Sequence, residues 1–293
     1  MPTPLPPLAG LATFTTAQKP GLAVHDNVDR LKRYHYALQR LFTVFNTRLT
    51  AEPQYELKMA FSYHAYLCSQ HIDTIRDRVA EMRHPPLGLD KIPDPHLQTF
   101  FDEILHAPTT AELLTGIYNH ALPALLGAVD QHLAETNPLA DAPTVRILGH
   151  LKTELTTALD YGQQALACYA AEQADLGAAL PTWSTLLKNL LAAAGSLSGT
   201  TTPPGSPDLT PIHSTSPIPY HQLRSPVRDQ RFPDPYNMGV HAEQFLYNQD
   251  YPADAKTLMM YYKRLREIDV PEMMASILVE ATDKPWAFHR DMA

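Results

Sequence analysis

QYELKMAFSYHAYLCSQHIDTIRDRVAEMR, residues 54–83, decides the fold class of this chain. Apolar side chains and two histidines recur there at steps of three and four residues, which is the spacing of one face of an α-helix. This stripe consists of Leu57, Phe61, His64, Cys68, His71, Ile75 and Met82. On the opposite side, which we expect to face solvent, lie Lys58, Arg76, Asp77 and Glu81. The stretch therefore predicts a long helix that turns two histidines, His64 and His71, onto its buried face.

Helical spacing also runs through most of the remaining chain. We expect further helices at about residues 26–50, 95–105, 110–135, 141–175, 183–197, 240–248 and 253–281. Pro123 should bend or split the third of these, and Asp94 and Asp141 are placed as N-caps because each precedes a first turn that contains proline. Alternating β-branched runs and Asn-Gly or Asp-Gly hairpin turns are absent from the sequence. The sequence predicts an all-α bundle of long helices.

Composition divides the chain into four segments. Residues 1–24 are expected to form an extended proline-rich tail, and residues 25–198 the first part of the helical bundle. Residues 199–239 are rich in Pro, Ser and Thr and are interpreted as a linker or a long surface loop. Residues 240–293 form the second part of the bundle. Because the chain ends within what resembles the first two turns of a helix, we expect either a fragment that lacks the rest of its last core helix or a short natural terminus.

Charge and cysteine content exclude several classes of protein. A net charge of −8 without any basic stripe argues against nucleic acid as a partner. No secretory signal begins the chain, and the best membrane candidate, 176–197, is interrupted by Lys188 and falls short of the roughly 20 apolar residues that a span needs. The two cysteines stand in no metal or redox spacing, which predicts a reduced, cytoplasmic protein. The 14 histidines are the unusual feature, and they raise the question of metal chemistry.

Two groups of histidines are candidates for that chemistry. His64 and His71 lie two helical turns, about 10 Å, apart, so they cannot hold one metal ion together. Each could join ligands from neighbouring helices, or could instead be a core histidine hydrogen-bonded to a carbonyl or a carboxylate. His150 and Glu154 are four residues apart, a spacing that fits a metal ligand pair, an ion pair or a plain hydrogen bond on one helix face. Glu154 also borders an apolar strip, so we expect it to be partly buried.

Two carboxylates near the C-terminus have two equally supported interpretations. Asp269 and Glu272 fall on the stripe of Leu258, Tyr262, Leu265 and Val279, which would turn them inward. The same residues also read as a capping-box-like helix start, with Pro271 in the first turn and Glu272 reaching back to the cap. The sequence contains no glycine-rich phosphate loop, Gly-x-Ser-x-Gly elbow or His-Glu-x-x-His motif.

Several of these segments resemble bacterial ferritin-like proteins of the domain-of-unknown-function 455 and tRNA-hydroxylase type. Tyr63-His64-Ala65-Tyr66, His71 and residues 76–83 resemble the first core helix of that family. Residues 137–148, Asn-Pro-Leu-Ala-Asp-Ala-Pro-Thr-Val-Arg-Ile-Leu, are similar to the family's entry into a second core helix. Residues 262–280 look like the third core helix, and 286–293 would begin the fourth.

The resemblance implies a ferritin-like bundle with additional helices and a metal site. Such proteins supply a Glu from each of two helices and a Glu-x-x-His from each of the other two. Carried over, the metal ligands would be His71, Glu154 and Glu272, with His64 and His150 behind them. The metal would be iron or manganese that activates O₂ toward a small-molecule substrate. This sequence departs from the family's ligand pattern at Gln70, where a carboxylate is expected, and at Thr157, where a histidine is expected.

Two functions follow from this comparison. The first is a non-haem diiron-type oxidoreductase or hydroxylase. The second is a metal-free ferritin-like scaffold that acts in binding or homo-oligomerisation, with its buried histidines in structural roles. A bundle that binds a small ligand is a third alternative.

Overall fold

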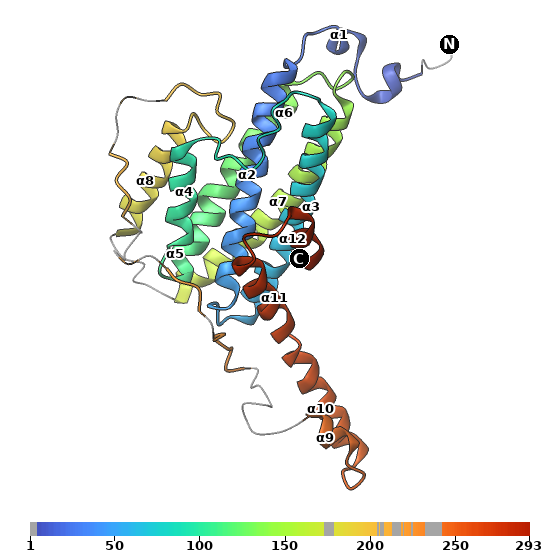
Figure 1. Ribbon diagram of the computed structural model, residues 1–293, viewed down its shortest axis with the longest axis vertical. Coiled ribbons are helices and arrows are strands. Elements are labelled where there is room, and N and C mark those ends of the chain that lie inside the picture. Colours follow the sequence, from blue (N-terminus) through green and yellow to red (C-terminus); the bar gives the residue numbers. More distant parts are fainter. Residues whose placement is uncertain are drawn as a thin grey trace. The chain divides into compact units, whose positions relative to one another are not determined.

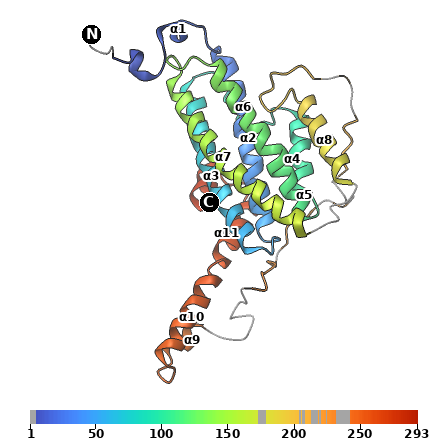
Figure 2. The same ribbon diagram turned by 180° about the vertical axis from the view of Figure 1, so that it is seen from behind.

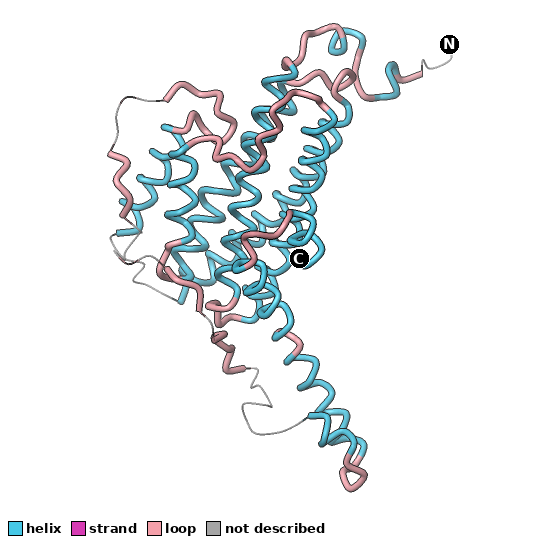
Figure 3. The backbone as a smooth tube through the Cα atoms, in the orientation of Figure 1, coloured by secondary structure: helices cyan, strands magenta, loops and turns pink. Residues whose placement is uncertain are grey.

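A computed structural model describes residues 5–172, 179–203, 205, 208–212, 218, 220–223, 225–231 and 242–293. Throughout these ranges the backbone forms helices joined by loops and turns, without a strand (Figure 3). The predicted all-α class is therefore confirmed. Along the same ranges, no helix is both long enough and apolar enough to cross a membrane.

The helices lie close to the residue ranges that the sequence predicts, and Figure 1 shows them. In chain order they are α2 (Val24–Leu49), α3 (Tyr55–Glu81), α4 (Pro95–Leu105), α5 (Thr110–Leu114), α6 (Leu122–Glu135), α7 (Ala142–Glu172), α8 (Ala179–Ala193), α9 (Ala242–Tyr247), α10 (Ala253–Arg266), α11 (Asp269–Glu280) and α12 (Trp286–Met292). Asp94 caps α4 as predicted, since its carboxylate accepts from the backbone N–H groups of His96 and Leu97. The helix expected over 253–281 is instead two helices that meet at Glu267 and Ile268.

The N-terminal segment is less extended than its proline content predicts. It contains a 3₁₀ turn, η1 (Pro7–Gly10), and a short helix, α1 (Phe14–Ala17). The side-chain amide of Asn137 donates to the carbonyls of Ala17 and Lys19 at 2.9 and 2.8 Å, which ties this segment down. Within the predicted linker, 199–239, none of the residues that the structure describes is helical.

The chain divides into two compact units that do not follow the predicted segment boundaries. Unit 1 comprises residues 1–42 and 67–221, and unit 2 comprises residues 43–66 and 222–293. The boundaries at 42/43 and 66/67 lie inside α2 and α3, where the helical pattern is unbroken. No composition change marks them, so the sequence gives no sign of this division.

Unit 1 is built from packed helix pairs, chiefly α6 with α7 and α4 with α8 (Figures 1 and 2). Trp183 of α8 is fully buried, and its indole N–H donates to Glu103 of α4 at 3.1 Å. Arg33 of α2 donates to the carbonyls of Ala194, Ser196 and Leu197 at 2.7 to 2.9 Å. Because these carbonyls follow the end of α8, the buried guanidinium satisfies groups that a helix C-terminus leaves without partners.

A π-helical turn, η2 (Thr115–Ala121), accommodates Pro123 between α5 and α6. The N–H of Leu122 bonds to the carbonyl of Ile117, five residues earlier. Pro123 has no N–H to offer the preceding turn, so a carbonyl there needs another donor. Gln163 of α7 supplies it, with its amide 3.0 Å from the Tyr118 carbonyl and 2.9 Å from the Asn119 side-chain oxygen. The predicted split at Pro123 is confirmed, and a side chain of α7 supplies the hydrogen bond that proline cannot make.

Replacing Gly162 with alanine is expected to destabilise unit 1 by about 3 kcal/mol. A Cβ atom at this position would lie 2.0 Å from the ring of Tyr118, which is completely buried and cannot move aside. Urea denaturation followed by circular dichroism measures the loss. Gly149→Ala on the same helix is the matched control, because a Cβ there meets nothing within 4 Å. It should be neutral or stabilising by up to about 1 kcal/mol. Equal effects of the two substitutions would contradict the packing described here.

Candidate functional site

The structure brings together two of the predicted metal ligands, His71 of α3 and Glu154 of α7. The Nε2 atom of His71 lies 2.7 Å from an Oε2 of Glu154, and both residues belong to unit 1. His71 is buried, as its place on the inward stripe predicts, and Glu154 is partly buried, as its apolar neighbours predict. The sequence pattern fixes each side chain's face, and the packing of α3 with α7 joins them.

Burial and the neighbouring charges shift the pKa of His71 in opposite directions. Burial lowers the pKa of its imidazole below the ordinary value, the Glu154 carboxylate opposes that shift, and the nearby His150 adds to it. His150 itself is exposed on α7, one turn before Glu154. No hydrogen bond between His150 and Glu154 is found in the structure as described, so the predicted pairing within α7 gives way to the pairing of Glu154 with His71. Imidazole nitrogen and carboxylate oxygen are donor types that iron and manganese accept.

His64 is buried in unit 2, where it contacts two aromatic rings, those of Phe45 and Tyr63. Its ring packs edge-on against Phe45 with the ring centroids 5.5 Å apart. Burial lowers the pKa of this imidazole to about 4, so it is neutral at pH 7. The predicted inward orientation of His64 is confirmed.

Glu272, the third predicted ligand, is held by two cations in unit 2. Its carboxylate accepts a hydrogen bond from the Lys58 ammonium, and both side chains are 2% exposed. The other carboxylate oxygen lies 2.7 Å from Nη2 of Arg228, which also donates to Asp269 at 2.5 Å. The structure thus resolves the two interpretations of Asp269 and Glu272. Both acids bind cations, and α11 has no side-chain cap, so the capping box is wrong.

Lys58 is the functional residue that the sequence interpretation misplaced. A charged side chain was assigned to the solvent-facing side, whereas Lys58 is buried with Glu272. A signal was present, because Lys58 stands three residues before Phe61 and shares a helical stripe with it. Arg228 was missed because it lies in a segment without periodicity. The pairing of residues 58 and 272 joins distant parts of the chain, which no local pattern predicts.

Burial and pairing compete at this ion pair. Burial raises the pKa of Glu272, while the charges of Lys58 and Arg228 lower it. Burial likewise lowers the pKa of Lys58, while Glu272 raises it. Removing either partner would leave an uncompensated charge in an apolar environment, which is costly.

A two-metal carboxylate centre does not fit these contacts. The carboxylate of Glu272 is already occupied by an ammonium and a guanidinium, which supply the positive charge that a metal would supply. Of the other predicted residues, His71, Glu154 and His150 belong to unit 1, and His64 belongs to unit 2 with Glu272. Where the structure describes the chain, no group of three or more His, Cys, Asp or Glu side chains is arranged to hold a metal ion.

Three further buried histidines have polar partners in unit 1. His132 donates to the side-chain oxygen of Asn27 at 2.5 Å, and His35 accepts from Arg76 at 3.2 Å. His120 lies 3.2 Å from the hydroxyl of Ser184. Burial lowers the pKa of His35 to about 3 and those of His120 and His132 to about 4. The high histidine content therefore includes several neutral core residues held by hydrogen bonds.

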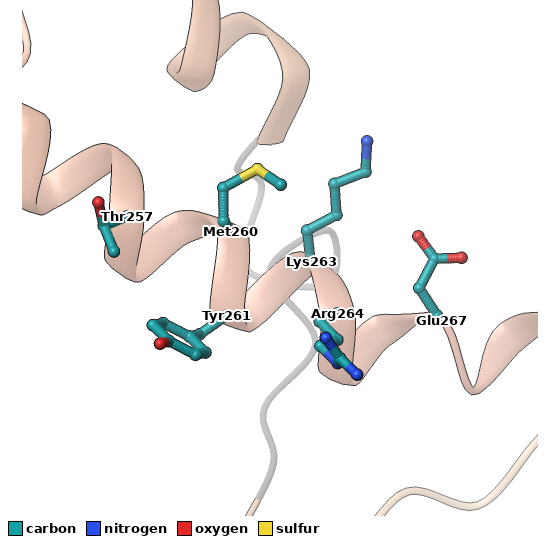
Figure 4. Close-up of a pocket in the computed structure, with 6 residues that line it drawn as sticks. All are labelled: Thr257, Met260, Tyr261, Lys263, Arg264 and Glu267. Atoms are coloured by element: carbon teal, nitrogen blue, oxygen red, sulfur yellow. The ribbon is translucent and has the colours of Figure 1, made fainter.

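Two cavities border the described residues of unit 2. The larger, of about 600 Å³, is lined among the described residues by five residues of α10 and by Glu267, which directly follows it (Figure 4). The six labelled side chains diverge around the helix in Figure 4. The smaller, of about 300 Å³, is lined by residues of α2, α3, α11 and α12.

Comparison of the chain with protein-family models, curated proteins and solved structures gave no match. Fold and contacts define the class of protein: an all-α helical protein with a buried Lys–Glu–Arg ion cluster in one unit and a His–Glu pair in the other.

Proposed function

We propose that this chain is a metal-independent helical scaffold that acts by binding, either to a second copy of itself or to another protein. Its buried histidines then have structural roles. The observation that carries this proposal is the contact of Glu272 with Lys58 and Arg228. A carboxylate that would be required to bind iron is neutralised by side chains of the protein itself.

An exposed row of side chains on α3 in unit 2 supports the binding role. Met59, Tyr63 and Tyr66 follow each other at helical spacing and are 45%, 57% and 43% exposed. The two tyrosine rings are stacked with their centroids 6.5 Å apart. Tyrosine and methionine are enriched in protein interfaces, and tyrosine supplies contact area there at a small entropic cost. We call Met59, Tyr63 and Tyr66 the tyrosine row.

A mononuclear iron or manganese oxidoreductase is the second candidate. It is favoured by the 2.7 Å contact of His71 with Glu154 and by the nearby His150, two imidazoles and one carboxylate in unit 1. Sets of two histidines and one carboxylate are the ligands of many non-haem iron oxygenases. In this candidate, a bound metal would supply O₂ activation, and His71, Glu154 and His150 would have to move together to hold it, since they do not form a metal-binding group as described.

Metal binding decides between the two candidates. We expect purified protein to contain far less than one iron or manganese per chain, and its melting temperature to stay unchanged when Fe²⁺ or Mn²⁺ is added. A ligand that binds only the folded state must stabilise it. Elemental analysis and thermal unfolding measure the two quantities. Stoichiometric metal that is lost in His71→Ala but retained in His25→Ala, a change at an exposed histidine, would overturn the scaffold proposal in favour of the oxidoreductase.

The same preparations test the binding role. If the tyrosine row mediates self-association, sedimentation velocity should show a concentration-dependent dimer that Tyr63→Ser converts to monomer. Tyr247→Ser, at a tyrosine 83% exposed on α9, is the matched control and should leave the dimer intact. A protein that stays monomeric and captures no partner through Tyr63 would contradict a binding role for this row.

A further inference from the structure

The smaller cavity of unit 2 is bordered by residues of four helices. Asn46 and Leu49 come from α2, Ser62 and Ala65 from α3, and Met274 and Leu278 are among the residues that α11 contributes. Met292 of α12 completes the lining on another side. Ser62 and Ala65 are small and lie three residues apart on one face of α3, which leaves space between α3 and α11. The volume of about 300 Å³ is at the lower end of the range for small-molecule sites.

The lining restricts the chemistry of an occupant. Among the described residues that border the cavity, no side chain carries a formal charge, so an ionised ligand would lose its hydration without gaining a counter-charge from them. Leucine, alanine and methionine side chains supply most of the wall, and methionine adapts its shape to different apolar groups. Asn46 and Ser62 supply the polar side chains, an amide and a hydroxyl, through which one polar group of a ligand can be recognised.

We propose that this cavity binds a small neutral molecule with an apolar, ring-sized body and a single hydroxyl or carbonyl group. The body occupies the space between α3 and α11, and its polar group bonds to Ser62 and Asn46. This inference goes beyond the scaffold function and does not depend on it, because it requires neither self-association nor the absence of metal. Its experiment measures neither self-association nor metal content.

Two fluorescent probes test the proposal on the full chain. Naphthalene matches the apolar body, and 2-naphthol adds one hydroxyl. We expect both to bind saturably at one molecule per chain, with 2-naphthol about fivefold tighter, the effect of one neutral hydrogen bond. Ala65→Leu places a larger side chain in the cavity and should weaken both probes at least about tenfold, without lowering the melting temperature, since it fills space. Ala80→Leu, on the exposed side of the same helix, is the matched control and should change neither.

Ser62→Ala provides a second variant if Ala65→Leu fails to fold, since Ser62 is only partly buried. It should weaken 2-naphthol about fivefold and leave naphthalene unchanged, so that the two probes bind equally. Three outcomes would each overturn the proposal: no saturable binding of either probe, undiminished binding to folded Ala65→Leu, or an equal loss of both probes in Ser62→Ala.

Discussion

Lys58→Met is expected to lower the free energy of unfolding by about 3–5 kcal/mol, the largest effect of any single substitution considered for this chain. Methionine preserves most of the volume of lysine, so the loss comes from the charge and not from a cavity. The carboxylate of Glu272, 2% exposed, would keep only Arg228 as a cationic partner. Because Arg228 remains, the loss should fall toward the lower end of that range. Urea denaturation at pH 7 measures it.

Two companion variants separate the ion pair from other causes. Lys58→Met combined with Glu272→Leu removes both buried charges and should recover most of the stability that Lys58→Met loses. Lys152→Met is the matched control, since Lys152 pairs with Asp130 at 2.7 Å but both side chains are nearly half exposed. Its expected effect is below about 1 kcal/mol. If the double variant were as unstable as the sum of its single substitutions, the two residues would not be energetically coupled.

Acidification from pH 6.5 to pH 4.5 is expected to destabilise the fold strongly. Burial lowers the pKa of His64, His120 and His132 to about 4 and that of His35 to about 3. In the unfolded chain each imidazole takes up its proton near the ordinary value of about 6.5. Between these pH values the unfolded chain binds more protons than the folded chain, so stability falls as the pH falls. Each such histidine contributes up to about 1.4 kcal/mol per pH unit.

The free energy of unfolding, measured in urea at intervals between pH 4.5 and 6.5, gives this slope directly. His120→Gln should reduce the slope by the equivalent of about one proton, because it removes one buried imidazole. His25→Gln, at a side chain on the surface, is the matched control. The window also separates the histidines from Asp229, whose pKa its ion pair with Arg231 lowers to about 2, so that this carboxylate contributes only at lower pH. A flat dependence above pH 4.5 would show that the buried histidines do not govern acid stability.

The helices could be predicted where the sequence carries both periodicity and a stop signal. Asp94-Pro95 begins α4, and Pro85-Pro86 ends α3, because a cap or a proline acts locally. The break between α10 and α11 was foreseen only in the interpretation of residues 269–272 as a helix start, since Glu267 and Ile268 contain no glycine, proline or capping side chain. The π-turn before Pro123 was expected only as a bend or a split, because the side-chain donor that completes it, Gln163, belongs to another helix.

The burial of single candidate-site residues could be predicted from the sequence, but the contacts between these residues could not. Helical spacing placed His64, His71 and Glu154 on inward or half-buried faces, and the structure confirms these positions. Helical spacing could not show that Glu154 contacts His71, or that Glu272 contacts Lys58, because such contacts depend on how helices distant in sequence pack. Assigning Lys58 to solvent was wrong, since a buried cation is acceptable once a long-range partner neutralises it.

The π-turn at residues 115–121 makes the length of this segment critical for everything that follows it. Each residue of an α-helix turns the chain by about 100°, so deleting one residue here would rotate the whole of α6 about its axis. His132 would then point away from Asn27, and the Ala128 carbonyl away from the hydroxyl of Tyr34. A substitution in this turn changes the contacts of one side chain, whereas a single insertion or deletion changes every contact of a helix at once. The number of residues in the turn is therefore constrained in addition to their identity, since six of its seven residues are buried.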